Sequence, residues 1–350
     1  MQRKLHATVL LPGLMCGGFA FLAGALAQTA AAQSPGSLYG PQGVSPEAVR
    51  QGVLGSCYFH ASIASLAKAA PEKLRGAITG NLSAGYRVRF FEGPEEVVLP
   101  ADLAYGRAHS FDRSEGDWVL VLMRGYAQRQ VRLSLANSIR QSTMIPAYAK
   151  PMALSWLDQS GMLLVAYDRA IRSVVDQQGL MNKSTFIQAL AKQLTALGIP
   201  ATEAAMLSGF LEEKGFFDAL AKAVSENGEV FGAYKSLGQG GIPVRVIEAF
   251  QGSARAGFVA DHSAMVQQLR RLRSGSVAIV AGTFNNAPRA DYELADWWVP
   301  SHAYSVLDYD DYTQTVSLRN PWGRQPGPDG SFTLSLSTFL GAYESYSYTE

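Results

Sequence analysis

Helical and strand-like patterns are segregated along this chain of 350 residues. Apolar residues at helical spacing dominate the first half, whereas short β-rich runs divided by polar turns dominate the second. A helical first half and a β-rich second half fit an α+β fold. With 47% hydrophobic residues the chain can form one large or two ordinary domains. The net charge of +1, without long runs of one sign, gives no reason to expect a nucleic-acid partner.

Residues 1–32 have the three parts of an export signal. "MQRK" is positive, an apolar stretch runs from about residue 8 to 27, and the small residues "ALAQTAAAQS" follow with two small-x-small cleavage patterns. An uncleaved membrane anchor is the alternative because the apolar stretch is long, but its glycines, its proline and its alanine-rich end favour cleavage. We therefore expect an exported protein, periplasmic or extracellular, with no stable membrane insertion after cleavage.

Signal cleavage would remove Cys16 and leave Cys57 as a single thiol. No disulfide is then available within the chain, although an exporting pathway leads to an oxidising compartment. Such a cysteine is either a small buried hydrophobe or a nucleophile, and composition alone does not separate the two.

The position of Cys57 favours the nucleophile. The stretch "QGVLGSCYFHASIASLAKAAP" (residues 51–71) predicts a helix that Ser56 caps and Pro71 ends, with Cys57 in its first turn. Free backbone N–H groups and the helix dipole there would lower the pKa of the thiol.

The loop before this helix predicts the remaining parts of a nucleophile site. Gly52 and Gly55 allow a tight turn against a bound substrate. Gln51 lies six residues before the cysteine, and its side-chain amide is a candidate donor to a developing oxyanion.

A thiol nucleophile needs a base, and four histidines lie outside the signal: His60, His109, His262 and His302. His60 lies one helical turn after the cysteine, on the flank of the same helix, which makes it a weak candidate. His109 and His262 lie in polar, turn-like surroundings and are expected at the solvated surface. His302 is therefore the preferred base.

His302 opens "SHAYSVLDYDDYTQTVSLRNPWG", two β-rich runs joined by a polar turn that predict a hairpin. If the turn centres on Asp311, His302 and Asn320 face each other directly across the two strands. An asparagine that holds one ring nitrogen of a histidine leaves the other for the thiol, as in a Cys-His-Asn triad.

These segments resemble the calpain-type (papain-like) cysteine peptidases, in an exported, bacterial-style form of the catalytic core. The family patterns Q-G-x-L-G-D-C-W, G-H-A-Y-S-V and R-N-P-W-G correspond to "QGVLGSCY", "SHAYSV" and "RNPWG". In these motifs and in the helix that follows the first of them, the chain departs from the family at Ser56, Tyr58, His60 and Ser301. Two further stretches, "EEVVLPADLAYGRAHSFDRSEGDWVLVLMRGYAQ" and "DGSFTLSLSTFLGAYESYSY", agree in order, so that the similarity covers most of residues 50–128 and 230–350.

The resemblance implies a papain-like two-lobed fold, with the cleft between a cysteine-bearing and a histidine-bearing lobe. It also implies that Trp322 shields the His-Asn pair from water, and we assign Gly55, Ser301 and Trp322 to substrate binding. Residues 33–48 form a short flexible lead-in, and 49–350 form the catalytic domain.

A helical insertion at about 129–231 lengthens that domain beyond the family pattern, either as a packed subdomain or as a lid or exosite. Its predicted helices include one with a Thr185/Gln188 capping box. Elsewhere the patterns predict a hairpin over 85–99, a helix over 261–273 and a strand in "SVAIVAG".

No metal cofactor is expected, because the chain has neither a C-x-x-C nor an H-E-x-x-H arrangement. The resemblance suggests calcium regulation, but Ala48, Arg324 and Pro326 stand where the family has acidic residues. A calcium ion needs several oxygen ligands, so we expect calcium-independent activity.

The leading hypothesis is a monomeric cysteine endopeptidase that acts on protein or peptide substrates through Cys57, His302, Asn320 and Gln51. Two alternatives stay open. The same triad supports acyl transfer or amide cross-linking when an amine outcompetes water. A catalytically inactive binding module on the same scaffold is the third hypothesis, encouraged by the changes at Ser56, Tyr58 and His60.

Overall fold

The computed structural model describes residues 37–141, 143, 147–148, 150–151, 154–155, 170, 183–196, 200–202, 204–205, 234, 237–275, 277–286 and 295–350. The predicted signal, the first residues of the lead-in and most of the predicted insertion lie outside the described residues.

The elements follow in chain order. They are α1 (Cys57–Ala69), α2 (Pro71–Gly76), β1 (Ile78–Asn81), β2 (Gly85–Val88), β3 (Glu96–Val98), α3 (Pro100–Ala108), α4 (Trp118–Gln141), α7 (Lys183–Ala196), α11 (Pro243–Gln251), β4 (Ala254–Phe258), α12 (His262–Leu272), β5 (Ile279–Thr283), β6 (Ala303–Asp310), β7 (Thr315–Arg319), β8 (Ser331–Ser335), α14 (Leu336–Ala342) and β9 (Tyr343–Thr349).

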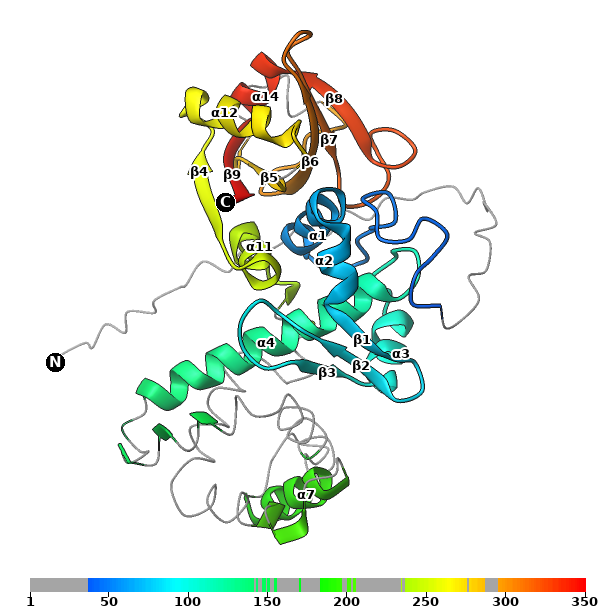
Figure 1. Cartoon of the computed structure of the whole chain (residues 1–350), viewed down its shortest axis with the longest axis vertical. Coiled ribbons are helices and arrows are strands. Elements are labelled where there is room, and N and C mark those ends of the chain that lie inside the picture. The colour runs from blue at the N-terminus through cyan, green and yellow to red at the C-terminus, as the bar shows by residue number, and fades with distance from the viewer. Residues whose placement is uncertain are drawn as a thin grey trace, which may run out of the picture. The chain divides into compact units, whose positions relative to one another are not determined.

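The fold mixes helices with two antiparallel sheets, so the α+β prediction is confirmed at that level (Figure 1). The larger sheet has six strands in the order β4-β9-β5-β6-β7-β8, and the smaller has the order β1-β2-β3. All strand pairs are antiparallel. The β2–β3 pair is the hairpin predicted over 85–99.

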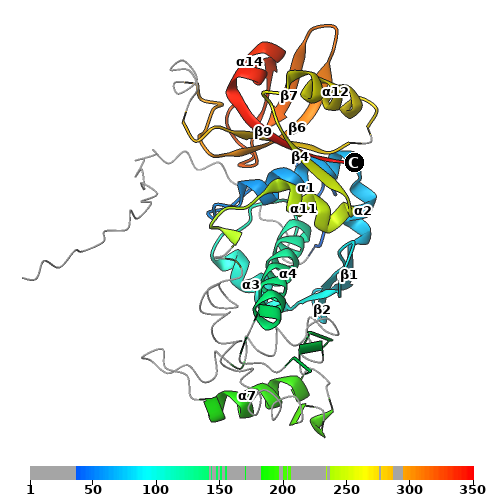
Figure 2. The same cartoon turned by 90° about the vertical axis from the view of Figure 1, so that its left-hand side faces the viewer.

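Helix α1 lies against one face of the larger sheet and is buried on nearly every side (Figure 2). It contacts β5 and β6, and also α2, α4 and α11. Alanine and serine at positions such as Ala61, Ala64 and Ser65 let the neighbouring elements approach closely, and a helix that is apolar all round belongs in a core.

Strand β5 divides the interior into two hydrophobic clusters because its side chains alternate between the two faces of the sheet. Ala278 and Val280 pack with α1 in the first cluster. Ile279 and Ala281 pack in the second, which also holds apolar side chains of α12 and α14. Because Cys57 begins α1, the cysteine lies on the face of the sheet that carries the first cluster.

The predicted register of the hairpin near Asp311 is wrong. The strand partners are Ser305↔Arg319, Val306↔Leu318, Asp308↔Ser317, Tyr309↔Val316 and Asp310↔Thr315, with an irregularity after Val306. The turn therefore lies later than Asp311, and His302 and Asn320 are not direct partners across the strands. Asp310 stabilises this turn by accepting hydrogen bonds from the backbone N–H groups of Tyr312 and Thr313.

Two helix boundaries also differ from the predictions. Helix α4 runs without interruption from Trp118 to Gln141, so the insertion expected from about 129 does not begin at a break in the backbone. Helix α7 begins at Lys183, before Thr185, which puts the predicted capping residue inside the first turn. By contrast, α12 begins after Asp261, whose carboxylate accepts from the Ala264 N–H as a normal cap.

In the part of the chain that the structure describes, no helix combines the length and the apolar character needed to cross a membrane.

Candidate active site

Cys57 and His302 line one small cavity of about 210 Å³. Cys57 is the first residue of α1, and His302 immediately precedes β6. Tyr58, Gly240, Gly241 and Ser301 also line this cavity. The nucleophile and base chosen from the sequence therefore come together, and they do so across the contact between α1 and the larger sheet.

Asn320 holds the imidazole of His302 in one orientation. His302 Nε2 donates to Asn320 Oδ1 at 3.1 Å, which leaves Nδ1 as the basic nitrogen. The same Oδ1 accepts from the backbone N–H of Trp322 at 3.1 Å. The Trp322 ring lies 5.0 Å from the imidazole, centroid to centroid, and helps to cover it. The predicted pair forms despite the wrong register, because the residues beyond the strand ends converge.

Thr283 fixes the backbone of His302, and sequence reasoning missed it. The hydroxyl of Thr283 accepts from the His302 N–H at 2.9 Å, and the Thr283 N–H donates to the His302 carbonyl at 2.9 Å. Thr283 ends β5, where a shift in strand pairing occurs. The local sequence does not distinguish Thr283 from any other threonine at the end of a strand, so its role could not be predicted.

Buried serines connect α1 to the sheet and thereby fix the distance between the cysteine and the histidine. Ser65 Oγ donates to the Ile279 carbonyl at 2.7 Å, and Ser305 Oγ donates to the Ala61 carbonyl at 2.9 Å. Both serines are almost fully buried. Each hydrogen bond fixes the position of α1 on the sheet, because a shift of the helix would leave a buried polar group without a partner.

Burial changes the pKa of both Cys57 and His302. It raises the pKa of the Cys57 thiol, although the backbone N–H groups of Ala303, Tyr58 and Cys57 itself lower that pKa in part. Burial lowers the pKa of His302 to about 4, against the opposing effect of the Asn320 hydrogen bond. The prediction of a lowered thiol pKa is wrong, because desolvation outweighs the helix terminus. Neutral thiol and neutral imidazole therefore form the resting pair.

Gln51, Gly55 and Ser56 are placed differently from expectation. Gln51 is buried, but its Nε2 donates to the Leu54 carbonyl at 2.5 Å, and neither Gln51 nor Gly55 lines the Cys57 cavity. Gly55 is exposed, and a Cβ there would lie 2.5 Å from the Gly238 carbonyl oxygen. Ser56 precedes α1 but makes no side-chain cap.

Ser301 lines the cavity with its backbone in the left-handed region, at φ 49°. The family has glycine at this position, and glycine adopts this conformation without strain. Here the Ser301 hydroxyl donates to Asn285 Oδ1 at 2.7 Å, which helps to hold the loop before His302.

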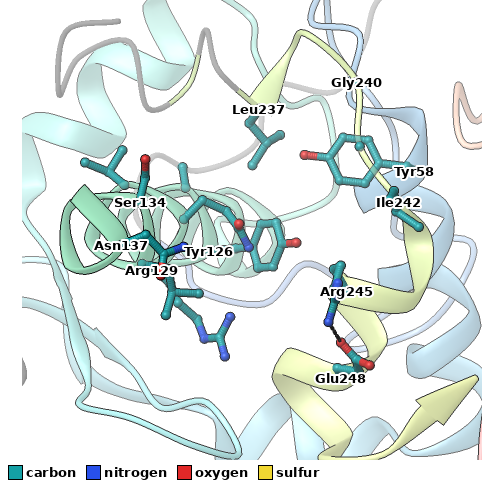
Figure 3. A pocket seen from close by; sticks show the side chains of 15 residues that line it. Tyr58, Tyr126, Arg129, Ser134, Asn137, Leu237, Gly240, Ile242, Arg245 and Glu248 are labelled. Atoms are coloured by element: carbon teal, nitrogen blue, oxygen red, sulfur yellow. Dashed lines mark hydrogen bonds and ion pairs between the residues drawn. The ribbon is translucent and has the colours of Figure 1, made fainter. Parts of the chain in front are cut away.

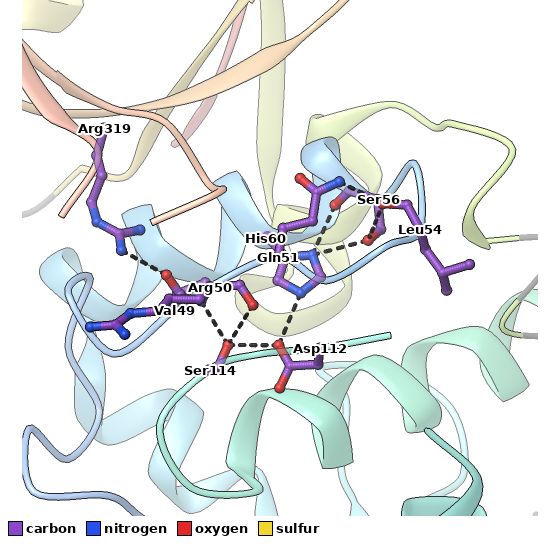
Figure 4. Close-up of polar contacts among 9 residues, drawn as sticks. All are labelled: Val49, Arg50, Gln51, Leu54, Ser56, His60, Asp112, Ser114 and Arg319. Carbon is purple, nitrogen blue, oxygen red and sulfur yellow. Dashed lines mark hydrogen bonds and ion pairs between the residues drawn. The ribbon is translucent and has the colours of Figure 1, made fainter. Parts of the chain in front are cut away.

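His60 has a structural partner rather than a place in the cavity (Figure 4). Its Nε2 lies 3.1 Å from Asp112 Oδ1, and its Nδ1 lies 3.0 Å from the Ser56 carbonyl oxygen. The His60 side chain is fully buried, and 3% of the Asp112 side chain is exposed. His60 is therefore no longer a candidate for the base. His109 and His262 are exposed, as predicted.

The His60 pair continues to the chain just before the cysteine loop (Figure 4). Ser114 Oγ donates to Asp112 Oδ1 at 2.6 Å and accepts from the Arg50 N–H at 2.8 Å. This network ties residues 50–56, α1 and the segment 112–114 together. A histidine on a mostly apolar helix is a sign that a buried polar partner exists. The partner, Asp112, lies 52 residues away, and the local sequence does not identify it.

Several oxygens near Ala48 and after Arg324 are bonded within the chain itself. The carbonyl oxygens of Glu47 and Val49 both accept from the Arg319 guanidinium, at 3.4 and 2.7 Å. The Asp329 carboxylate accepts from the backbone N–H and hydroxyl of Ser331. Within the described ranges, no group of three or more His, Cys, Asp or Glu side chains is arranged to hold a metal ion.

Comparisons with known proteins add little. No family model matches the chain, and no curated protein matches it. Among solved structures, PepW from Lactobacillus rhamnosis HN001 is similar over 87% of this chain and 80% of that chain, at 12% identity and a TM-score of 0.32. A likeness this distant carries no argument about the fold or the activity of the present protein.

Proposed function

We propose that the protein is a cysteine endopeptidase of the calpain-like type, with Cys57 as nucleophile and His302 as base. One observation carries the proposal. Cys57 and His302 line the same cavity, and the hydrogen bond from His302 Nε2 to Asn320 leaves Nδ1 free to act as the base. A structural cysteine needs no oriented imidazole beside it.

Acylation starts from the neutral pair. The thiol proton moves to His302 Nδ1 as Sγ attacks the carbonyl carbon of the scissile peptide bond. The imidazolium then gives that proton to the leaving nitrogen as the C–N bond breaks, which leaves a thioester and a free amine. Because burial keeps the pKa of His302 at about 4, the base is already deprotonated at neutral pH.

Deacylation repeats the proton transfers with water. His302 removes a proton from the attacking water and returns it to Sγ as the thioester breaks, releasing a carboxylic acid. The Cys57 backbone N–H is the candidate oxyanion donor. Gln51 can contribute only its second amide hydrogen, because the first is bonded to Leu54.

The finer architecture belongs to the same proposal. We assign the two hydrophobic clusters to the two lobes of a papain-like fold: Cys57 packs against the first, and the His302 ring contacts Tyr304 of the second at 4.9 Å, centroid to centroid. Export, signal cleavage and activity without calcium remain part of this hypothesis.

The test is hydrolysis of fluorescein-labelled casein by residues 33–350, compared with the Cys57→Ala and Cys57→Ser variants. We expect both variants to keep the melting temperature within a few degrees and to lose hydrolysis. Cleavage by either variant would refute the role of Cys57. A dansylated primary amine added to the same assay separates hydrolysis from acyl transfer, because only the second enzyme attaches the amine to casein.

Alkylation reports the protonation state of the resting thiol, and casein hydrolysis then distinguishes an active site from a binding module. With a raised thiol pKa, we expect the rate of iodoacetamide reaction at Cys57 to climb through the alkaline range, with no plateau near pH 6. A fast plateau at acidic pH would show a preformed thiolate and contradict the neutral pair. A slow reaction together with no casein hydrolysis would favour the binding module.

A further inference from the structure

A second, larger cavity opens beside the proposed active site (Figure 3). Its volume is about 520 Å³, and α4, α11 and residues 237–242 form its walls. Tyr58, Gly240 and Gly241 line both this cavity and the one that holds Cys57. The two cavities are therefore neighbours across a narrow wall that one tyrosine and two glycines build.

The wall between the cavities leaves space for a polypeptide. Gly240 has φ 96°, and a Cβ added there would meet no heavy atom within 4 Å. At Gly241 an added Cβ would lie 2.4 Å from the Tyr58 ring. The Tyr58 ring therefore packs directly on Gly241, whereas the space beside Gly240 is open, and a backbone without a side chain there is what an extended peptide can approach closely.

Among the described residues that line the larger cavity, one cationic side chain has no carboxylate partner. Arg245 is paired with Glu248 at 2.9 Å, as Figure 3 shows, and Arg132 behind the cavity is paired with Glu96 at 2.7 Å. Within the described ranges Arg129 makes no ion pair, and its Nε is buried without a hydrogen-bond partner.

Packing holds the guanidinium of Arg129 in place. It lies over the Phe90 ring at 5.5 Å, which is a normal cation–π distance. Burial and the nearby charge of Arg132 both lower the pKa of Arg129, so its surroundings already disfavour the cation. An anion that enters the cavity relieves this cost, because a charge-assisted hydrogen bond is stronger than a neutral one.

We propose that this cavity binds an acidic side chain of the polypeptide substrate, with Arg129 as the residue that selects it. The inference rests on the proposed peptidase function, since it names the substrate class that would reach Cys57. A glutamate or aspartate near the scissile bond would place its carboxylate on Arg129, while Tyr58 and Tyr126 cover its aliphatic part.

The experiment measures binding without turnover. Fluorescein-labelled nonapeptides carry one glutamate that moves through an uncharged sequence, and each has a partner peptide with glutamine at that position. Fluorescence anisotropy gives the affinity of each peptide for the Cys57→Ala variant. At one position we expect glutamate to bind about tenfold tighter than glutamine, the size of a single charge-assisted bond.

Variants of Arg129 decide whether this residue is the cause. In the Cys57→Ala background, Arg129→Gln should reduce the preference to about one, and Arg129→Lys should restore part of it because the charge returns. Arg270→Gln removes the same charge from α12, on the other face of the sheet, and should leave the preference intact. Equal binding of both peptides at every position, or a preference that survives Arg129→Gln, would overturn the inference.

This design separates the two hypotheses. If the wild-type protein cleaves casein but shows no preference for glutamate in binding, the inference fails and the peptidase stands. If a preference that depends on Arg129 is found while the wild type cleaves nothing, the cavity binds acidic peptides and the peptidase assignment fails.

Discussion

Acid should destabilise this protein through His302 in particular. The imidazole is 7% exposed, and burial lowers its pKa from 6.5 to about 4. In the unfolded chain the same group takes up a proton at pH values near 6.5. The unfolded state therefore binds more protons between pH 6.5 and 4, so stability falls as the pH falls through that range.

The size of the effect follows from the pKa difference. The gap between 6.5 and about 4, at about 1.4 kcal/mol for each pH unit, corresponds to about 3 kcal/mol at pH 4. All of this contribution is present above pH 7. A loss of that size is a large fraction of the stability of an ordinary domain.

Guanidinium unfolding of the wild type and of His302→Gln at pH 7, 5.5 and 4 isolates this contribution. Glutamine keeps an amide that can donate to Asn320 but does not titrate, and the other ionisable groups change equally in both proteins. We expect the stability difference between the two proteins to shift by about 3 kcal/mol in favour of the variant from pH 7 to pH 4. A constant difference would refute the reasoning, because His302 would then titrate with its ordinary pKa.

Three further predictions concern the residues around the site. Asn320→Ala removes the bond to His302 and should lower kcat by about tenfold to a hundredfold with little change in KM; a matching rise in KM would instead place Asn320 in substrate binding. His60→Phe removes one hydrogen bond from the buried Asp112 carboxylate, which keeps the bond from Ser114, and should cost about 2 kcal/mol in chemical unfolding, most of which Asp112→Asn should recover in the double variant; additive losses would argue against a coupled pair. Gly52→Ala would put a Cβ 2.0 Å from the Ser110 carbonyl and should destabilise by about 2 kcal/mol, whereas Gly76→Ala meets no atom within 4 Å and should stay within about 0.5 kcal/mol.

The sequence predicted the elements near the site better than the contacts between them. The helix from Cys57, the hairpin over 85–99 and the helix after Asp261 all form, since apolar periodicity and turn residues are local signals. The hairpin register after His302 was wrong because the turn lies later than Asp311, with Asp310 paired to Thr315, and an irregularity after Val306 then shifts the pairing by one residue.

The partners of the candidate residues were the least predictable part. Gln51 was chosen as an oxyanion donor from its spacing, but its amide is used within its own loop. The thiol pKa was expected to fall because the helix terminus is visible in the sequence, whereas burial is a property of the packed structure and acts in the opposite direction.

The sequence by itself determined the α+β class, the start of the cysteine helix and the choice of Cys57, His302 and Asn320, because these follow from local patterns and from residue chemistry. Only the tertiary structure decided that Asp112 pairs with His60, that Thr283 holds the His302 backbone and that Arg129 faces a cavity next to the thiol. Each of these depends on segments distant in sequence meeting in the core, where burial and charge are set by all the neighbours at once.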